Sequence, residues 1–167
     1  MKIRDMTRCA MFAALLAVCA WISVPVGDLA VSLQTLAVFL TLGAMGGRKG
    51  SMTFLVYLLL GAVGLPVFTG MQGGLGILLG PTGGYIWGFL AAGLVFWVLE
   101  MRAALWLCMI SALLTCYACG TAWYYFVYAQ GGLWAVILKC VVPYLLPDGT
   151  KLAVALLVIP RLKKTTP

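Results

Sequence analysis

The sequence predicts an all-α integral membrane protein, a bundle of six transmembrane helices with a glycine-rich external lid loop. The hydrophobic share of its 167 residues is 64% and the charged share is 9%, against roughly 45–50% and about 25% in soluble domains. A soluble fold of this length exposes too much surface to hide so many apolar side chains. A lipid-facing exterior removes that conflict, and at about 20 residues per span the chain has room for about six helices.

Apolar runs divide the whole chain, 1–167, into the spans of a single transmembrane domain. The first run continues past the length of a signal peptide, so we expect it to remain as a span. The fourth span starts at Pro81, a residue favoured in the first turn of a helix, and the fifth has a candidate break at Gly120. Residues 131–146 end between two prolines and are predicted to form a short re-entrant or interfacial helix. The expected spans cover residues 7–25, 31–46, 51–65, 81–100, 103–129 and 147–162.

The basic residues predict the orientation in the membrane, because Lys and Arg concentrate in cytoplasmic loops. With six spans and a cytoplasmic N-terminus, nine of the eleven Lys and Arg residues face the cytoplasm, and only Lys139 and Lys151 do not. The opposite orientation would place the nine outside, so we expect both termini in the cytoplasm. The nine are Lys2, Arg4, Arg8, Arg48, Lys49, Arg102, Arg161, Lys163 and Lys164.

The reactive residues provide no recognisable catalytic machinery. The chain has no histidine, no Gly-x-Ser-x-Gly elbow and no phosphate-binding loop, so we expect no enzymatic activity, and any ATP hydrolysis must come from another chain. The net charge of +7 does not predict nucleic-acid binding, because the basic residues form no patch interleaved with aromatic ones. Cys116 and Cys119 have metal-site spacing, but nothing completes a ligand set. We interpret the cysteines as packing residues and expect neither metal nor cofactor.

Two charged residues stand at the predicted start of the last span. Asp148 and Lys151 are three residues apart, which places them on one face of a helix. An isolated Asp or Lys deep in a span costs about 2.5–3.5 kcal/mol on insertion scales, and mutual pairing lowers that cost. One interpretation is a salt bridge that pins the helix start, with Asp148 as the cap. The other is a polar floor for a ligand, since intramembrane ionisable residues commonly mark substrate sites.

A second candidate region is the glycine-rich stretch that follows the third span. Glycine reaches backbone angles that other residues avoid, so residues 70–76 suit either a plain flexible loop or a lid over a site. Gly83 and Gly84 are poor helix formers in the first turn of the fourth span. Close approach of another backbone or a ligand would explain them, and the exposed amides there could hold an anionic group.

A stripe of alanines marks one face of the first span. Small residues at helical spacing let helices pack closely in lipid. The stripe is therefore either an internal packing seam or a docking face for another membrane subunit. Its members are Ala10, Ala13, Ala14 and Ala17.

Taken together, these features resemble the BioY family, the biotin-specific substrate-binding (S) components of energy-coupling-factor (ECF) transporters. The resemblance covers nearly the whole chain, and the Gly-Pro-Thr-Gly-Gly-Tyr run with a distant Asp-x-x-Lys is specific in combination. One departure is Leu146-Pro147-Asp148, where the family often has Pro-Gly-Asp. The matching pieces are Leu33-Gln34-Thr35, the run from Leu58 to Phe68, Gly73-Gly74-Leu75, Gly80-Pro81-Thr82-Gly83-Gly84-Tyr85 and Pro147-Asp148-x-x-Lys151.

The resemblance implies a six-helix fold in a bacterial cell membrane and capture of biotin from the external side. Delivery would require association with a transmembrane coupling protein and two ABC ATPase subunits, with the coupling protein docked on the alanine stripe. Asp148 would accept a hydrogen bond from the biotin urea and Lys151 would donate one. The substrate-binding residues expected on this basis are Gln34, Gln72, Gly73, Gly74, Gly83, Gly84, Tyr85, Asp148 and Lys151. The alternatives are an S component for a different vitamin and a membrane scaffold that binds no ligand.

Overall fold

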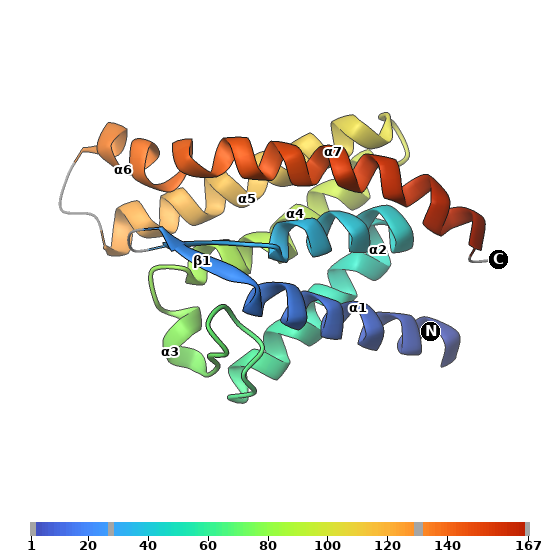
Figure 1. Ribbon diagram of the computed structural model, residues 1–167, viewed down its shortest axis with the longest axis horizontal. Helices are drawn as coiled ribbons and strands as arrows, with labels where there is room; N and C mark the ends of the chain where they lie inside the picture. The colour runs from blue at the N-terminus through green and yellow to red at the C-terminus, as the bar shows by residue number, and fades with distance from the viewer. Residues whose placement is uncertain (1–2, 27–28, 129–131, 166–167) are drawn as a thin grey trace.

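The computed structural model describes residues 3–26, 29–128 and 132–165 of the chain. Long helices lie beside one another, and the two ends of the chain lie at the same end of the bundle (Figure 1). The elements in order are α1 (Ile3–Trp21), β1 (Ser23–Val26), β2 (Leu29–Ser32), α2 (Gln34–Ala62), α3 (Leu75–Leu78), α4 (Gly83–Leu99), α5 (Leu105–Val127), α6 (Leu133–Cys140) and α7 (Val142–Thr165).

A short β-hairpin occupies the expected end of the first span and the expected start of the second. Its strands pair antiparallel, with Ser23 opposite Ser32. The Leu33 N–H donates to the Ile22 carbonyl at 3.0 Å and closes the base of the hairpin. β-Branched valines in both strands favour extended backbone. The fold is therefore mostly helical rather than all-α, and residues 27 and 28, between the strands, lie outside the described residues.

The second and third expected spans are the two halves of α2, whose chain folds back on itself at a non-helical residue, Gly46. The backbone there has φ 78° and ψ 170°, a conformation that glycine adopts without strain. Glu100, which follows α4, accepts a hydrogen bond of 2.8 Å through Oε2 from the Gly47 N–H. That bond satisfies a backbone donor that the kink leaves without a helical partner. The two halves therefore lie side by side: a side chain at Gly50 would overlap Leu42, and Gln34 in the first half bonds to Tyr57 in the second. The turn expected between these spans is thus the sharp kink at Gly46.

The fifth expected span is a continuous helix, so the candidate break at Gly120 is absent. α5 runs from Leu105 to Val127. A side chain at position 120 would overlap the ring of Tyr85 on α4. Gly120 therefore allows α4 and α5 to approach closely, which is a common use of small residues between membrane helices.

The last part of the chain differs from the expectation for residues 131–146. The short helix α6 ends at Cys140, and the final helix already begins at Val142; residue 131 lies outside the described residues. Pro143 falls in the first turn of α7, where a missing N–H costs nothing. Asp148 consequently lies in the second turn of α7, and the expectation that it caps the helix is wrong.

Apolar side chains cover the outside of the helices as well as the core. Phe126 is 82% exposed and Leu157 is 75% exposed. Two stretches, Leu105–Val127 and Leu133–Leu162, the second formed by α6 and α7, are long and apolar enough to cross a bilayer, whereas Gly83–Leu99 is apolar but shorter. An exterior of this kind suits contact with lipid, because soluble monomers rarely expose large apolar surfaces.

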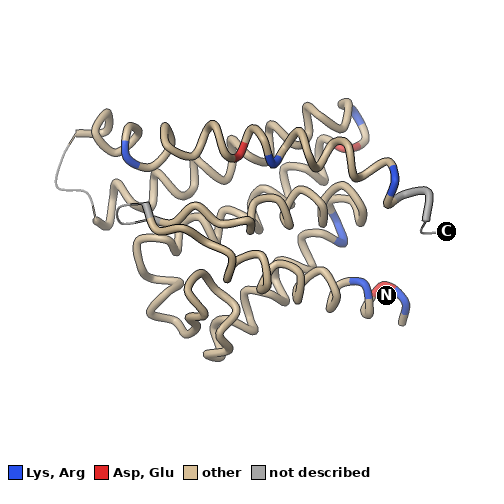
Figure 2. Tube along the Cα trace, in the orientation of Figure 1, with Lys and Arg blue, Asp and Glu red and all other residues tan. Residues whose placement is uncertain are grey.

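The charged residues are unevenly distributed along the bundle (Figure 2). Most of them lie toward the end that holds both termini. The opposite end carries α6, whose basic residue is Lys139. Asp148 and Lys151 pair within α7, well away from the charged end.

Candidate functional site

A cavity of about 420 Å³ lies between the hairpin, the loop after α2 and helices α2, α4, α5 and α7. Aromatic side chains, among them Phe68 and Phe89, form part of its wall. Hydroxyl and amide groups also line it, and Asp148 and Lys151 supply its charged groups. A mostly apolar hollow with a few convergent polar groups is the usual form of a small-molecule site, commonly about 300–1,000 Å³.

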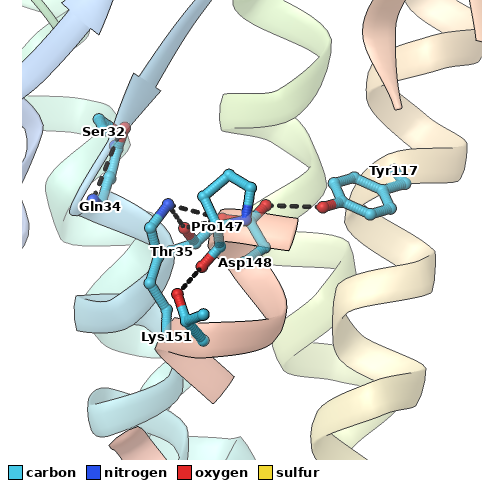
Figure 3. Close-up of polar contacts among 8 residues, drawn as sticks. Ser32, Gln34, Thr35, Tyr117, Pro147, Asp148 and Lys151 are labelled. Carbon is cyan, nitrogen blue, oxygen red and sulfur yellow. Dashed lines mark hydrogen bonds and ion pairs between the residues drawn. The ribbon is translucent and has the colours of Figure 1, made fainter. Parts of the chain in front are cut away.

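Four side chains, here called the Asp148 network, join three helices at one wall of the cavity (Figure 3). Lys151 Nζ lies 2.6 Å from Asp148 Oδ1. The Thr35 hydroxyl donates to the same oxygen at 2.8 Å and accepts from Lys151 Nζ at 3.0 Å. The Tyr117 hydroxyl donates to Asp148 Oδ2 at 2.7 Å. α2, α5 and α7 therefore meet at a single carboxylate.

The Asp148 network buries its charges as a neutral unit. Asp148 is 3% exposed and Lys151 is 8% exposed, and an unpaired ion buried to this degree would cost several kcal/mol. Each partner still has unused bonding capacity. Asp148 Oδ2 accepts one bond and has a second lone pair, and Lys151 uses two of its three N–H groups. The wall thus offers an acceptor beside a donor, without net charge.

The structure brings five of the nine predicted substrate-binding residues to the cavity. Gln34 reaches it from the first turn of α2, Gln72 from the loop after α2, and Tyr85 from α4. The Tyr85 hydroxyl donates to the Cys140 carbonyl at 2.9 Å, which ties α4 to α6. Together with Asp148 and Lys151, these residues come from segments more than a hundred positions apart in the sequence.

The four predicted glycines are not among the residues that line the cavity. A side chain at Gly73 would overlap the Leu65 carbonyl, and one at Gly84 would overlap Trp123 on α5. A side chain at Gly83 would likewise overlap the Leu78 carbonyl, and Gly74 has φ 98°. Close backbone approach and a positive φ explain these glycines without a ligand.

Several residues of the cavity were not predicted as site residues. Thr35 belongs to the Leu33-Gln34-Thr35 motif, so its position beside Gln34 was the available signal. Tyr117 lies within an apolar span, where a buried hydroxyl needs a partner, and that requirement could have linked it to Asp148. Ser23 and Ser32 line the cavity from the hairpin. The Gly27-Asp28 dipeptide between two valine-containing runs was the available signal for that hairpin.

The alanine stripe divides into two faces of α1. Ala13 is 3% and Ala17 is 7% exposed, and both belong to the same buried core as side chains of α2. Ala10 and Ala14 are exposed. The internal seam thus explains half of the stripe, and the other half remains accessible on the surface of α1.

Among the described residues, no three His, Cys, Asp or Glu side chains gather in a group that could hold a metal ion. The cysteines in that part of the chain are free thiols.

Comparisons with known proteins connect this geometry to one family. The sequence model of the BioY family matches residues 1–167. A protein of Thermotoga maritima named biotin transporter BioY is 35% identical over 170 residues, covering 96% of each chain. One of Pyrococcus horikoshii named probable biotin transporter BioY is 37% identical over 166 residues, covering 99% of this chain and 100% of its own. The crystal structure of the S-component for biotin from an ECF-type ABC transporter matches with a TM-score of 0.85 at 25% identity, covering 98% of this chain and 93% of that one.

Proposed function

The chain belongs to the BioY family, and we propose that it is the S component of an ECF-type ABC transporter that captures biotin from the external side of a bacterial cell membrane. The observation that carries this proposal is the buried Asp148 network on the wall of a cavity of about 420 Å³. The relatives named above carry the names biotin transporter and probable biotin transporter, and the matching crystal structure is that of an S-component for biotin.

The chemistry of biotin fits the free bonding positions of this wall. A urea group presents N–H donors and a carbonyl acceptor. Asp148 Oδ2 can accept from a urea N–H, and the third N–H of Lys151 can donate to the urea carbonyl. The neutral pair suits a neutral urea, because no net charge has to be compensated on binding. Phe68, Ile86 and Phe89, also on the cavity wall, supply apolar surface for the fused rings.

The distribution of charge supports a multi-pass topology with both termini in the cytoplasm. The end of the bundle that holds both termini also holds most of the Lys and Arg residues (Figure 2), as the positive-inside rule requires of the cytoplasmic side. The hairpin and α6 then lie toward the external side, and residues of the hairpin line the cavity. Lys2, one of the nine residues used for this assignment, lies outside the described residues.

Energy for uptake would come from partner subunits. We assign the exposed half of the alanine stripe, Ala10 and Ala14, to docking of the ECF transmembrane coupling protein, because small side chains permit close helix packing in lipid. Two ABC ATPase subunits would bind that coupling protein and hydrolyse ATP. The chain itself would then perform no catalysis.

The glycine-rich segment 70–76 would serve as the lid. Gly70 and Gln72 line the cavity, and Gly70 has φ 72° while Met71 has φ 57°. Glycine adopts a positive φ without steric strain, so the backbone can change conformation at Gly70 at a low cost in free energy. Closure of the segment over bound biotin would then exclude water from the cavity.

Competition binding tests the choice of ligand. The purified protein in detergent or nanodiscs is incubated with radiolabelled biotin and an excess of unlabelled biotin, thiamine or riboflavin. Displacement by biotin alone supports the proposal. Displacement by another vitamin would indicate an S component of different specificity, and absence of any retained label in folded protein would indicate a scaffold.

A further inference from the structure

Tyr57 is not among the lining residues, but its hydroxyl bonds to one lining residue and to the residue that precedes a lining segment. Its side chain is 1% exposed. Its hydroxyl donates to the Val67 carbonyl at 2.7 Å and accepts from Gln34 Nε2 at 2.8 Å. Gln34 lines the cavity from α2, and Val67 directly precedes the turn formed by residues 68–72, which also lines the cavity.

The hydroxyl of Tyr57 determines which end of the Gln34 amide faces it. A phenol has one proton to donate, and the Val67 carbonyl, which can only accept, takes that proton. The phenol oxygen can then only accept, so the NH₂ group of Gln34 must face Tyr57. The Gln34 carbonyl oxygen, for which the structure shows no hydrogen bond, is the end of the amide left for a ligand.

Tyr57 also holds the turn 68–72 against the bundle. The Phe68 ring is 1% exposed and packs edge-to-face on Tyr57, with ring centroids 5.5 Å apart. The Phe68 N–H donates to the Gln72 carbonyl at 2.9 Å and closes the turn. The hydrogen bond from Tyr57 to the Val67 carbonyl holds in place the residue that immediately precedes this turn. One phenol thus supports both Gln34 and the turn that carries Gln72.

We propose that Tyr57 is a positioning residue that sets Gln34 as a hydrogen-bond acceptor toward the ligand and anchors the turn 68–72 to the cavity wall. This inference rests on the proposed function for its ligand. With Gln34 so oriented, the cavity presents an acceptor at Gln34, a donor at Lys151 and an acceptor at Asp148. That set complements a urea, which offers N–H, C=O and N–H.

The substitution Tyr57→Phe tests the inference because it removes the hydroxyl and keeps the ring that packs on Phe68. Tyr128→Phe is the matched control: its hydroxyl also donates to a backbone carbonyl, that of Leu79, at 2.6 Å, and Tyr128 does not line the cavity. Hydrogen exchange of the Phe68 amide is measured in the ligand-free protein. Biotin affinity is measured for Tyr57→Phe, Gln34→Ala and the double variant.

The inference predicts about five- to tenfold faster exchange at Phe68 in Tyr57→Phe and unchanged exchange there in Tyr128→Phe. Tyr57→Phe should also weaken biotin by about tenfold. In the Gln34→Ala background the same substitution should cost much less, because the amide that it positions is gone. Unchanged exchange at Phe68, or fully additive losses in biotin affinity, would overturn the inference. If the wild-type chain binds no biotin while Tyr57→Phe still exchanges faster than wild type at Phe68, the proposed function is contradicted and the anchoring role is supported, because the exchange measurement needs no ligand.

Discussion

Lys151 Nζ lies 2.6 Å from Asp148 Oδ1, one helical turn away on α7, with 9% and 4% of the two side chains exposed. The pair is buried where the bundle would otherwise be apolar, and it borders a cavity rather than a solid core. A buried ion pair is weak evidence for stability, because desolvation can exceed the Coulombic gain. Its position and its free bonding capacity are therefore better explained by ligand recognition.

Asp148→Asn separates recognition from a purely structural salt bridge. Loss of a charge-assisted hydrogen bond of roughly 1.5–3 kcal/mol should weaken biotin about ten- to a hundredfold per folded molecule. Isothermal titration, normalised to folded protein, measures this for Asp148→Asn and for Lys151→Gln. If both variants lose thermal stability but bind biotin with normal affinity, the pair is structural only. Asp5→Asn is the control, because it breaks the more exposed Asp5–Lys49 ion pair and should leave affinity unchanged.

Tyr117→Phe tests whether the third donor to Asp148 orients the carboxylate. The Tyr117 hydroxyl donates to Asp148 Oδ2 at 2.7 Å and so limits rotation of the carboxylate. Oδ2 is the oxygen that we expect to accept a hydrogen bond from a urea N–H. We expect about a tenfold rise in the dissociation constant for biotin, from loss of roughly 1 kcal/mol or more. Equal affinity in wild type and variant would show that Asp148 is held well enough by Thr35 and Lys151.

Ala14→Trp tests the docking face on α1. A bulky side chain at this exposed position should prevent co-purification with the coupling protein and leave biotin binding intact. Ala13→Trp is the contrasting variant: because Ala13 is buried, overpacking should lower thermal stability instead. Leu157→Trp, on the exposed surface of α7, should affect neither property. Normal assembly of Ala14→Trp would favour an internal seam alone.

A cysteine at position 72 reports on the lid. In a Cys-free background, Gln72→Cys should react more slowly with a bulky polar thiol reagent when biotin is saturating, because closure removes the residue from solvent. Met101→Cys is the control, since Met101 is 86% exposed and lies in the loop between α4 and α5. Equal rates at position 72 with and without biotin would indicate a passive loop.

Labelling from outside the cell tests the orientation of the bundle. With both termini in the cytoplasm, a membrane-impermeant thiol reagent should not reach Lys164→Cys in intact cells, whereas it should reach Trp134→Cys on α6, which is 71% exposed. The reverse pattern would invert the topology.

The helical membrane character and the charged pair could be predicted because each depends on local chemistry. Long apolar runs require lipid, and Asp148 and Lys151 stand out in a chain with so few charges. Their partners could not be predicted in the same way. Thr35 and Tyr117 reach Asp148 from positions 113 and 31 residues away, and only the packing of α2 and α5 against α7 brings them together.

The errors at element boundaries have a common physical cause. Hydropathy distinguishes lipid-compatible residues from polar ones, but it does not distinguish a helix from a hairpin at the end of a span. The early start of α7 at Val142 lies in apolar sequence, and the short valine-containing runs of the hairpin from Ser23 to Ser32 directly continue the apolar first and second spans. Gly83 and Gly84 were expected to permit close approach of another backbone or a ligand. The structure shows that the approaching groups are protein atoms.

Calorimetric titration of biotin into the purified wild-type chain tests the central claim most directly. We expect one biotin bound per chain, and about ten- to a hundredfold weaker binding in Asp148→Asn protein that remains folded. A folded wild-type chain that releases no heat with biotin and gains no thermal stability from it would contradict the assignment.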